Sequence, residues 1–389
     1  MKSAANLLGV LLCFFWIGLA QAAPSESDRH WAAPIRAGGD APPESLTPQS
    51  CGTCHADKLA AWSSSRHAHA FSPGLLGQLL DFASCTEVTA CLKCHAPLAE
   101  QQMPWSSSSC VNPARPWQQK KQTWLVEAGV ICAGCHQREG VVIGPVAQKE
   151  TKNNNPHARS RQVEGLSQSA FCGFCHQFSE DLAVNGKPIQ NTLAEWQASP
   201  FPARGMTCQK CHMPEGRHSF LGIHDPETVA NGLTVQVESD AAGALYKVGS
   251  TAIGHAFPTY MIPRVTLQGM LFDAKGREIK EQRRQFILER RMEYVGDLLQ
   301  EQVDTRLLPG KEVQIRVAWH SDGREGVRIQ FRLIVEPDYH YQTHVFNRLL
   351  ENPQSDLARD FIRRAMQQAG ESRYTLFEKT VMRDNSLVN

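Results

Sequence analysis

The chain has 389 residues, a length that accommodates two domains. It carries 40 Lys and Arg against 39 Asp and Glu, so its formal net charge is +1. This near-neutral balance argues against a nucleic-acid partner, because nucleic-acid-binding domains present strongly basic patches. Basic and acidic residues are also mixed along the chain, so no basic patch for a membrane surface is evident.

The N-terminus has the three parts of a secretory signal peptide. Lys2 is positively charged, residues 7–20 form an apolar run, and Ala20-Gln21-Ala22 is a small-x-small site before Ala23. We expect cleavage of residues 1–22 and a periplasmic or secreted mature protein. An uncleaved membrane anchor is the alternative, although the run is short for a span, which needs about 20 apolar residues. A lipoprotein is disfavoured because Cys13 lies inside the run.

Cysteine is the most informative residue type. One of the thirteen cysteines, Cys13, leaves with the signal peptide, so twelve (13 − 1) remain. Ten of these belong to five copies of Cys-x-x-Cys-His, which we number one to five in chain order. The motif cysteines are Cys51, Cys54, Cys91, Cys94, Cys132, Cys135, Cys172, Cys175, Cys208 and Cys211. The motif histidines are His55, His95, His136, His176 and His212.

Each residue of this motif has a task in covalent haem attachment. The two thiols form thioethers with the haem vinyl groups, and the adjacent histidine becomes the proximal iron ligand. Zinc knuckles also use Cys-x-x-Cys, but they pair up and their histidines usually come later. A redox dithiol would occur once, and a disulfide framework requires no histidine. The five motifs therefore predict five covalent c-type haems, each with one iron.

The motifs are evenly spaced along the chain. The steps between their first cysteines are 40, 41, 40 and 36 residues, which indicates repeated units that each enclose one haem. Five haems in so short a segment must pack close together, as a series of electron-transfer sites requires. We expect short helices after each motif, with loops between them.

The composition changes along the mature chain. Residues 23–50 are rich in Pro, Ser and Ala and predict an extended arm, residues 51–225 form the haem domain, and residues 226–389 form a second domain. The second domain contains alternating runs typical of strands, at 233–237, 265–272, 313–319 and 327–335. They predict a β-sandwich over about 231–345, followed by a terminal helix near 356–368. The predicted fold is thus a haem-rich domain of short helices and loops, then a C-terminal β-sandwich with a terminal helix.

Several segments resemble the cytochrome c-552/4-like multihaem cytochromes, which are related to the hydroxylamine oxidoreductase group. The resemblance covers most of residues 47–270. It rests on Trp62-Ser-Ser-Ser-Arg-His67-Ala-His-Ala70, Gly129-Val130 before the third motif, Phe171–Phe178, Glu195–Ser199, Gly205–Pro214, His218–Asp225 and Gly254-His255-Ala-Phe-Pro258-Thr259. Tyr260 departs from the pattern, since many relatives have Gly there.

The resemblance also implies the distal iron ligands. A six-coordinate haem needs a second ligand, and the matching positions here are His67, His157, His218, His224 and His255. Their number equals the number of motifs, which predicts five bis-histidine haems. His69 is the alternative to His67.

We interpret the chain as an electron carrier that works between a redox donor protein and a redox acceptor protein. The alternative is a multihaem oxidoreductase that acts on nitrite, hydroxylamine or a sulfur oxyanion at a five-coordinate haem. Such an enzyme needs one vacant iron position with acids and bases beside it. No Cys-x-x-Cys-Lys variant occurs, which removes one signature of nitrite reductases. No catalytic residue can be assigned from the sequence.

Two cysteines remain without a haem role, Cys85 and Cys110. Because the expected compartment is oxidising, they predict a disulfide. On the chain-entropy model such a bridge stabilises the fold by roughly 3–4 kcal/mol.

Overall fold

A computed structural model describes most of the chain beyond its N-terminal segment. The described residues are 35–38, 43–81, 84–106, 124–145, 157, 160–296, 298–321, 323–351 and 355–383. The predicted signal peptide, much of the predicted arm and Cys110 lie outside them. Within these ranges, no helix combines the length and the apolar character needed to cross a bilayer.

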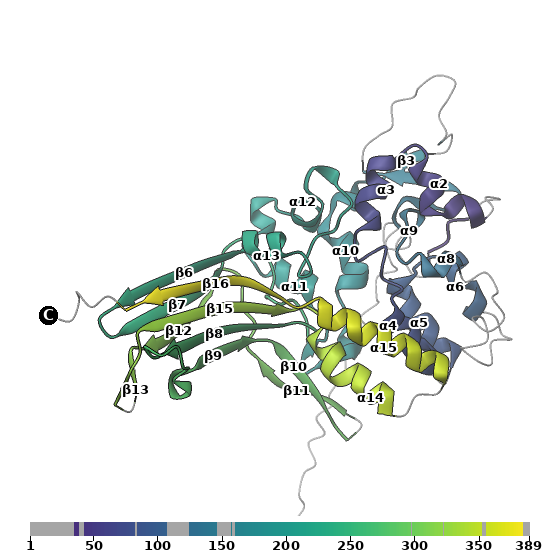
Figure 1. Cartoon of the computed structure of the whole chain (residues 1–389). Coiled ribbons are helices and arrows are strands. Elements are labelled where there is room, and N and C mark those ends of the chain that lie inside the picture. Colours follow the sequence, from purple (N-terminus) through teal and green to yellow (C-terminus); the bar gives the residue numbers. More distant parts are fainter. Residues whose placement is uncertain are drawn as a thin grey trace, which may run out of the picture.

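The chain forms first a part made of short helices and loops and then a part made of long antiparallel strands (Figure 1). After the strands, α14 (Phe346–Glu351) and α15 (Asp356–Glu371) return to the helical part. There α15 packs on α4 (Pro73–Asp81) so closely that a Cβ at Gly77 would lie 2.5 Å from Ile362 Cδ1. The C-terminal segment therefore joins the two parts.

Four of the five motifs occupy the C-terminal ends of helices. These helices are α5 (Cys85–His95), α9 (Cys132–His136), α10 (Ser169–His176) and α12 (Cys208–His212), whereas the first motif begins at the end of α2 (Pro48–Gly52). Residues three apart share one face of a helix, so the two thiols of each motif can reach one porphyrin edge. The side chains of Thr47, Ser84 and Thr207 cap α2, α5 and α12 by accepting backbone N–H groups.

The expectation of a short helix after every motif is wrong at the third motif. Helices α3 (Ala56–Ser63) and α6 (Ala99–Ser106) follow the first two motifs, and 3-10 turns follow the fourth and fifth. The third is followed by β1 (Gln137–Arg138), which pairs with β2 (Val141–Gly144). Glu139 and Gly140 have φ of 50° and 77°, which makes a tight hairpin turn and prevents a helix there.

The other short elements of the helical part lie between the motif helices, except the last, α13, which leads from the fifth motif to the strands. They are α8 (Trp124–Glu127), β3 (Ser160–Gln162), β4 (Ala183–Val184), β5 (Lys187–Pro188), α11 (Thr192–Gln197) and α13 (Pro226–Gly232).

Two antiparallel sheets make up the strand-rich part. The strand order is β12-β7-β6 in one sheet and β16-β15-β8-β9 in the other. The strands are β6 (Leu233–Asp240), β7 (Gly243–Ser250), β8 (Arg264–Phe272), β9 (Arg284–Leu288), β12 (Glu312–Ala318), β15 (Arg328–Glu336) and β16 (Tyr374–Met382). Two hairpins extend them, β10 (Arg290–Val295) with β11 (Leu298–Asp304) and β13 (His320–Ser321) with β14 (Arg324–Glu325).

The core of this part lies between the two sheets. Tyr246, Leu267, Val317 and Phe331 each have 0 % exposure, and they come from β7, β8, β12 and β15. A Cβ at Gly269 would lie 2.6 Å from Val317 Cγ2, so the sheets approach closely there. The four predicted strand runs and the predicted helix are confirmed. Strands β7, β9, β10 and β11 were not among the predicted runs, and neither was β16, which follows the helix and pairs with β15.

Candidate functional site

The motif cysteines of different motifs lie against one another. All ten are free thiols, and thiol hydrogen bonds join Cys51 to Cys132, Cys94 to Cys175 and Cys172 to Cys208. The first motif therefore neighbours the third, and the fourth neighbours both the second and the fifth.

The third motif also lies beside the fourth. The Cys135 thiol is close enough to add to the raised pKa values of Cys172 and Cys175, after their thiol hydrogen bonds and burial. The fourth motif thus has three neighbouring motifs, the second, third and fifth.

Four motif histidines each face one of the histidines predicted as distal ligands. The ring centroids are 6.1 Å apart for His55 and His157, 6.0 Å for His136 and His218, 6.3 Å for His176 and His67, and 6.3 Å for His212 and His255. The members of each pair come from distant parts of the sequence.

These separations leave room for one metal ion between the two rings. A metal–imidazole bond of about 2.0–2.1 Å on each side, plus about 1.1 Å from each nitrogen to its ring centre, gives about 6.3 Å. By contrast, His340 and His344 stack directly, with their centroids 4.8 Å apart. The four pairs therefore fit an iron that is held from both sides.

Backbone carbonyls orient several of these imidazoles. The Nδ1 atoms of His136, His212, His218 and His255 lie 3.0, 2.5, 2.9 and 2.9 Å from carbonyl oxygens. A histidine whose Nδ1–H donates to a carbonyl keeps the lone pair of Nε2 for a metal, which is the usual arrangement around metal-binding histidines.

Burial keeps the facing imidazoles neutral. It lowers the pKa of His67 to about 3, and those of His176 and His255 to about 4, with smaller effects from neighbouring groups. The neutral imidazole is the form that binds a metal, so these rings are prepared to ligate across the whole neutral pH range.

The second motif is different. His95 is oriented like the others, with Nδ1 2.7 Å from the Ala70 carbonyl, but within the described ranges no other histidine ring faces it. His224, the fifth predicted distal ligand, is not brought to a motif histidine. Its Nε2, the nitrogen that would bind iron, instead lies 3.0 Å from Asp338 Oδ2. His69 is exposed and faces no motif histidine ring in the part of the chain that is described.

A group of polar side chains gathers beside the second motif, which we call the Asp338 cluster: Arg66, His224, Tyr260, Asp338 and Tyr341. Burial raises the pKa of Tyr341, and nearby Asp338 and Cys91 add to this. Burial also raises the pKa of Tyr260, with Tyr341 and Asp338 adding to it. Burial opposes the charge of Asp338, but the hydrogen bond with His224 and the charge of Arg66 lower its pKa. The sequence offered two signals for this cluster, the departure at Tyr260 and the ligand context of His224.

Two tryptophans of the resembling segments fix the backbone ahead of motifs. Trp62 Nε1 donates to the Val130 carbonyl at 2.8 Å, and Trp196 Nε1 donates to the Met206 carbonyl at 2.9 Å. Each accepting residue lies two positions before a motif cysteine, Cys132 or Cys208. The bonds therefore hold the entry into the third and fifth motifs.

Cys85 is disulfide-bonded, unlike the motif cysteines. Its predicted partner, Cys110, lies outside the described residues.

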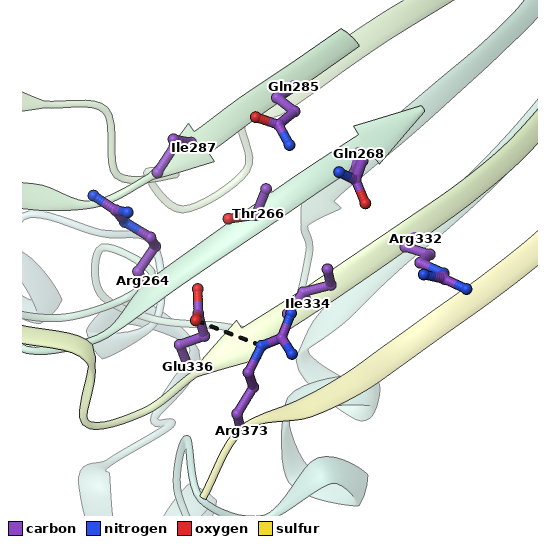
Figure 2. Close-up of a pocket in the computed structure, with 9 residues that line it drawn as sticks. All are labelled: Arg264, Thr266, Gln268, Gln285, Ile287, Arg332, Ile334, Glu336 and Arg373. Atoms are coloured by element: carbon purple, nitrogen blue, oxygen red, sulfur yellow. Dashed lines mark ion pairs between the residues drawn. The ribbon is translucent and has the colours of Figure 1, made fainter. Parts of the chain in front are cut away.

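A shallow hollow of about 300 Å³ lies on the face of the four-stranded sheet (Figure 2). Its three arginines, Arg264, Arg332 and Arg373, each pair with a glutamate. The hollow thus has no uncompensated positive charge for an anion and is lined by no motif residue.

Comparisons with known proteins bear on the fold. No protein-family model matches the chain, and no curated protein matches it in sequence. Among solved structures, the chain is similar to a penta-haem cytochrome c552 from Thermochromatium tepidum, with a TM-score of 0.59 and 15% sequence identity. The alignment covers 88% of this chain and 100% of that one. The likeness shows that the chain shares the fold of a penta-haem cytochrome c.

Proposed function

We propose that the chain is a periplasmic c-type cytochrome that binds five haems and transfers electrons between redox proteins. The observation that carries this proposal is the set of four histidine pairs, whose centroid separations of 6.0–6.3 Å each suit one iron. The fold shared with a penta-haem cytochrome c552 supports it.

The residues present fit covalent haem. Each motif offers two free thiols and a histidine, and the four facing imidazoles would complete six-coordinate irons. Bound haem supplies reversible one-electron chemistry, while the protein fixes the haem positions and tunes their potentials. Two neutral nitrogen ligands suit an iron that exchanges electrons without binding a substrate.

The packing of the motifs supports a connected array. The fourth motif adjoins the second, third and fifth, and the first adjoins the third. Cys54 of the first motif and Cys211 of the fifth are exposed, so these two ends of the array are the accessible ones. We infer that donor and acceptor proteins dock at the first and fifth motifs.

Two measurements on the mature holoprotein test this proposal. Mass spectrometry should find five attached haems and a chain that starts at Ala23. A potentiometric titration followed by absorption should then require five reversible one-electron steps. Fewer than five haems in fully matured protein, or haems that do not exchange electrons reversibly, would refute the proposal.

A second candidate function follows from His95. An iron held by His95 alone would keep one position open for a small molecule, such as nitrite, hydroxylamine or a sulfur oxyanion. The Asp338 cluster lies beside this motif, and His224 with Asp338 can hold a proton there. This observation favours an oxidoreductase whose other haems deliver electrons to the second motif.

Cyanide binding to the oxidised holoprotein separates the two functions. An open iron at His95 predicts that cyanide alters the absorption of one haem in five. It also predicts that the reduced protein is reoxidised by nitrite or hydroxylamine, and more slowly in His224→Ala. His30 lies outside the described residues, and His30→Ala is the control. If only that variant binds cyanide, His30 closes the site and the protein is a carrier alone.

A further inference from the structure

His255 reaches its partner from the strand-rich part of the chain. It lies in the loop between β7 and β8, and its ring stands 6.3 Å from that of His212 with an interplanar angle of 12°. Two residues beyond His255, Phe257 exchanges two backbone hydrogen bonds with Leu307, of 2.9 and 2.8 Å. The Ala256 carbonyl lies 2.9 Å from His255 Nδ1, so the contacts that fix Ala256 bear on the direction of the imidazole.

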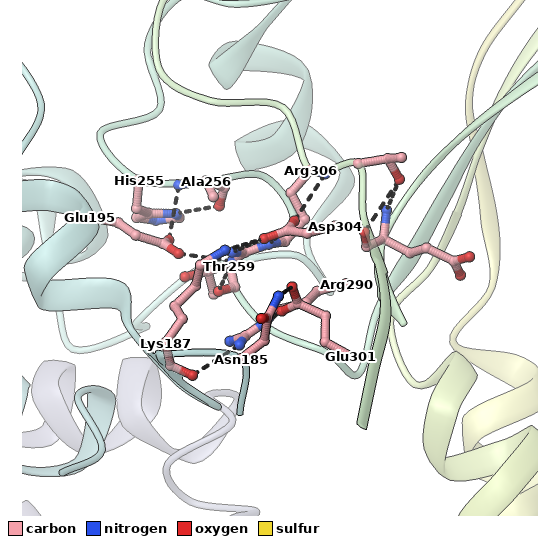
Figure 3. A network of polar contacts seen from close by, with 12 residues as sticks. Asn185, Lys187, Glu195, His255, Ala256, Thr259, Arg290, Glu301, Asp304 and Arg306 are labelled. Atoms are coloured by element: carbon pink, nitrogen blue, oxygen red, sulfur yellow. Dashed lines mark hydrogen bonds and ion pairs between the residues drawn. The ribbon is translucent and has the colours of Figure 1, made fainter. Parts of the chain in front are cut away.

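One ion pair holds both ends of the segment from Ala256 to Thr259 (Figure 3). Glu195 Oε2 accepts the Ala256 backbone N–H at 3.2 Å, and Glu195 Oε1 lies 2.9 Å from Arg306 Nη1. Arg306 Nη1 also donates to the Thr259 carbonyl at 2.7 Å. Glu195 comes from α11 in the helical part, so the pair ties the loop to the part that carries the motifs.

The Glu195–Arg306 ion pair is buried, and Asp304 and Lys187 continue the chain of charges toward the surface. The side chains of Arg306 and Glu195 are 2 % and 11 % exposed. Asp304 accepts from Arg306 Nε and Nη2 at 2.8 and 2.9 Å, and Lys187 lies 2.5 Å from Asp304. Two cations and two carboxylates balance in this network, so removal of Glu195 would leave a net positive charge around the buried Arg306, which is costly.

Helix α11 also contacts the loop directly. Thr192 Oγ1 and Thr259 Oγ1 are 2.7 Å apart and share a hydrogen bond. A Cβ at Gly254 would lie 3.1 Å from Trp196 Cδ1, so the residue before His255 is packed against this helix. The loop, the helix and the ion pair therefore form one rigid unit around His255.

We propose that Glu195 and Arg306 are positioning residues that hold His255 as the distal ligand opposite His212. The inference rests on the proposed function, in which His255 ligates the haem of the fifth motif. Loss of the Glu195 carboxylate frees the Ala256 N–H and leaves Arg306 with only Asp304. The loop then relaxes, and the imidazole of His255 leaves its position in front of His212.

The test compares ferric spectra of purified holoprotein variants, each checked by mass spectrometry for five haems. His255→Ala is the reference and should turn one haem in five high-spin. Glu195→Ala should reproduce that signal. Glu195→Gln keeps the size of the side chain and only one of the two acceptors, so it should give a smaller high-spin fraction of the same haem. Glu301→Ala is the matched control, because Glu301 of β11 pairs with the buried Arg290 of β10 and makes no hydrogen bond or ion pair with the loop in the described structure.

The outcomes distinguish the positioning role of Glu195 and Arg306 from the ligand role of His255. If His255→Ala adds the high-spin signal while both Glu195 variants keep the wild-type spectrum, the positioning role is overturned and the ligand assignment stands. A high-spin signal in Glu301→Ala equal to that in Glu195→Ala also overturns the role, because any loss of stability would then have the same effect. If His255→Ala itself adds no high-spin haem to the wild-type spectrum, the ligand assignment in the proposed function fails.

Discussion

Replacement of His67 by alanine tests the pairing of distant histidines. The His67 ring faces His176 across 6.3 Å, and burial keeps its pKa at about 3. Among the described residues, the other ring against it is that of Phe220, at 4.2 Å, which cannot bind iron. His67→Ala should therefore leave the iron at His176 with a single imidazole and convert one haem in five to the high-spin state.

The expected magnitude follows from the count of motifs. Relative to the wild type, the ferric low-spin signal in electron paramagnetic resonance should fall by one haem per chain, and a high-spin signal of one further haem per chain should replace it. Exogenous imidazole should reverse the change by filling the vacated position.

His69→Ala is the matched control for this prediction. It lies two residues from His67, but its side chain is exposed and faces no motif histidine within the described residues. Its spectrum should equal that of the wild type. If His69→Ala produces the high-spin haem and His67→Ala does not, the ligand assignment at the fourth motif is wrong.

Three further predictions concern stability. Arg290 has 0 % exposure and pairs with Glu301, so Arg290→Ala should lower the free energy of unfolding by about 3–5 kcal/mol in urea titrations. Trp62→Phe removes the hydrogen bond to the Val130 carbonyl and should cost about 1–3 kcal/mol while all five haems remain attached. Burial raises the pKa of Asp304, but hydrogen bonds from Arg306 and Lys187 outweigh it, so the net pKa lies below the usual value. The carboxylate therefore stabilises the fold above about pH 4, the pKa of an unfolded Asp, and this stabilisation fades as the pH falls. Asp304→Asn should thus be destabilising at pH 7, with a difference from wild type that narrows in acid; a difference that does not change with pH would contradict this.

The parts of the protein with a local signature could be predicted from the sequence. The motif cysteines and histidines are recognised by their spacing alone, and alternation indicates strands such as β8 and β15, in which every second residue is buried. Strand β16 escaped because its sequence is amphipathic only in part and its residues are half-buried or exposed. Its place depends on pairing with β15, which the local pattern does not encode.

The surroundings of the second motif could not be predicted, because they depend on long-range packing. Asp338 and Tyr341 follow β15, and they reach the motif only because α14 and α15 fold back onto α4. His224 has the sequence context of a ligand, yet its Nε2 is bonded to Asp338. The resemblance identified five candidate ligands, but it could not show that Nε2 of His224 is hydrogen-bonded to Asp338.

The most direct test of the account is a quantitative electron paramagnetic resonance spectrum of the oxidised wild-type holoprotein, normalised to its haem content. The four facing histidine pairs predict at least four low-spin haems per chain. A fifth low-spin haem would favour the carrier, whereas one high-spin haem would favour an open position at the second motif. Two or more high-spin haems would contradict the histidine pairs themselves.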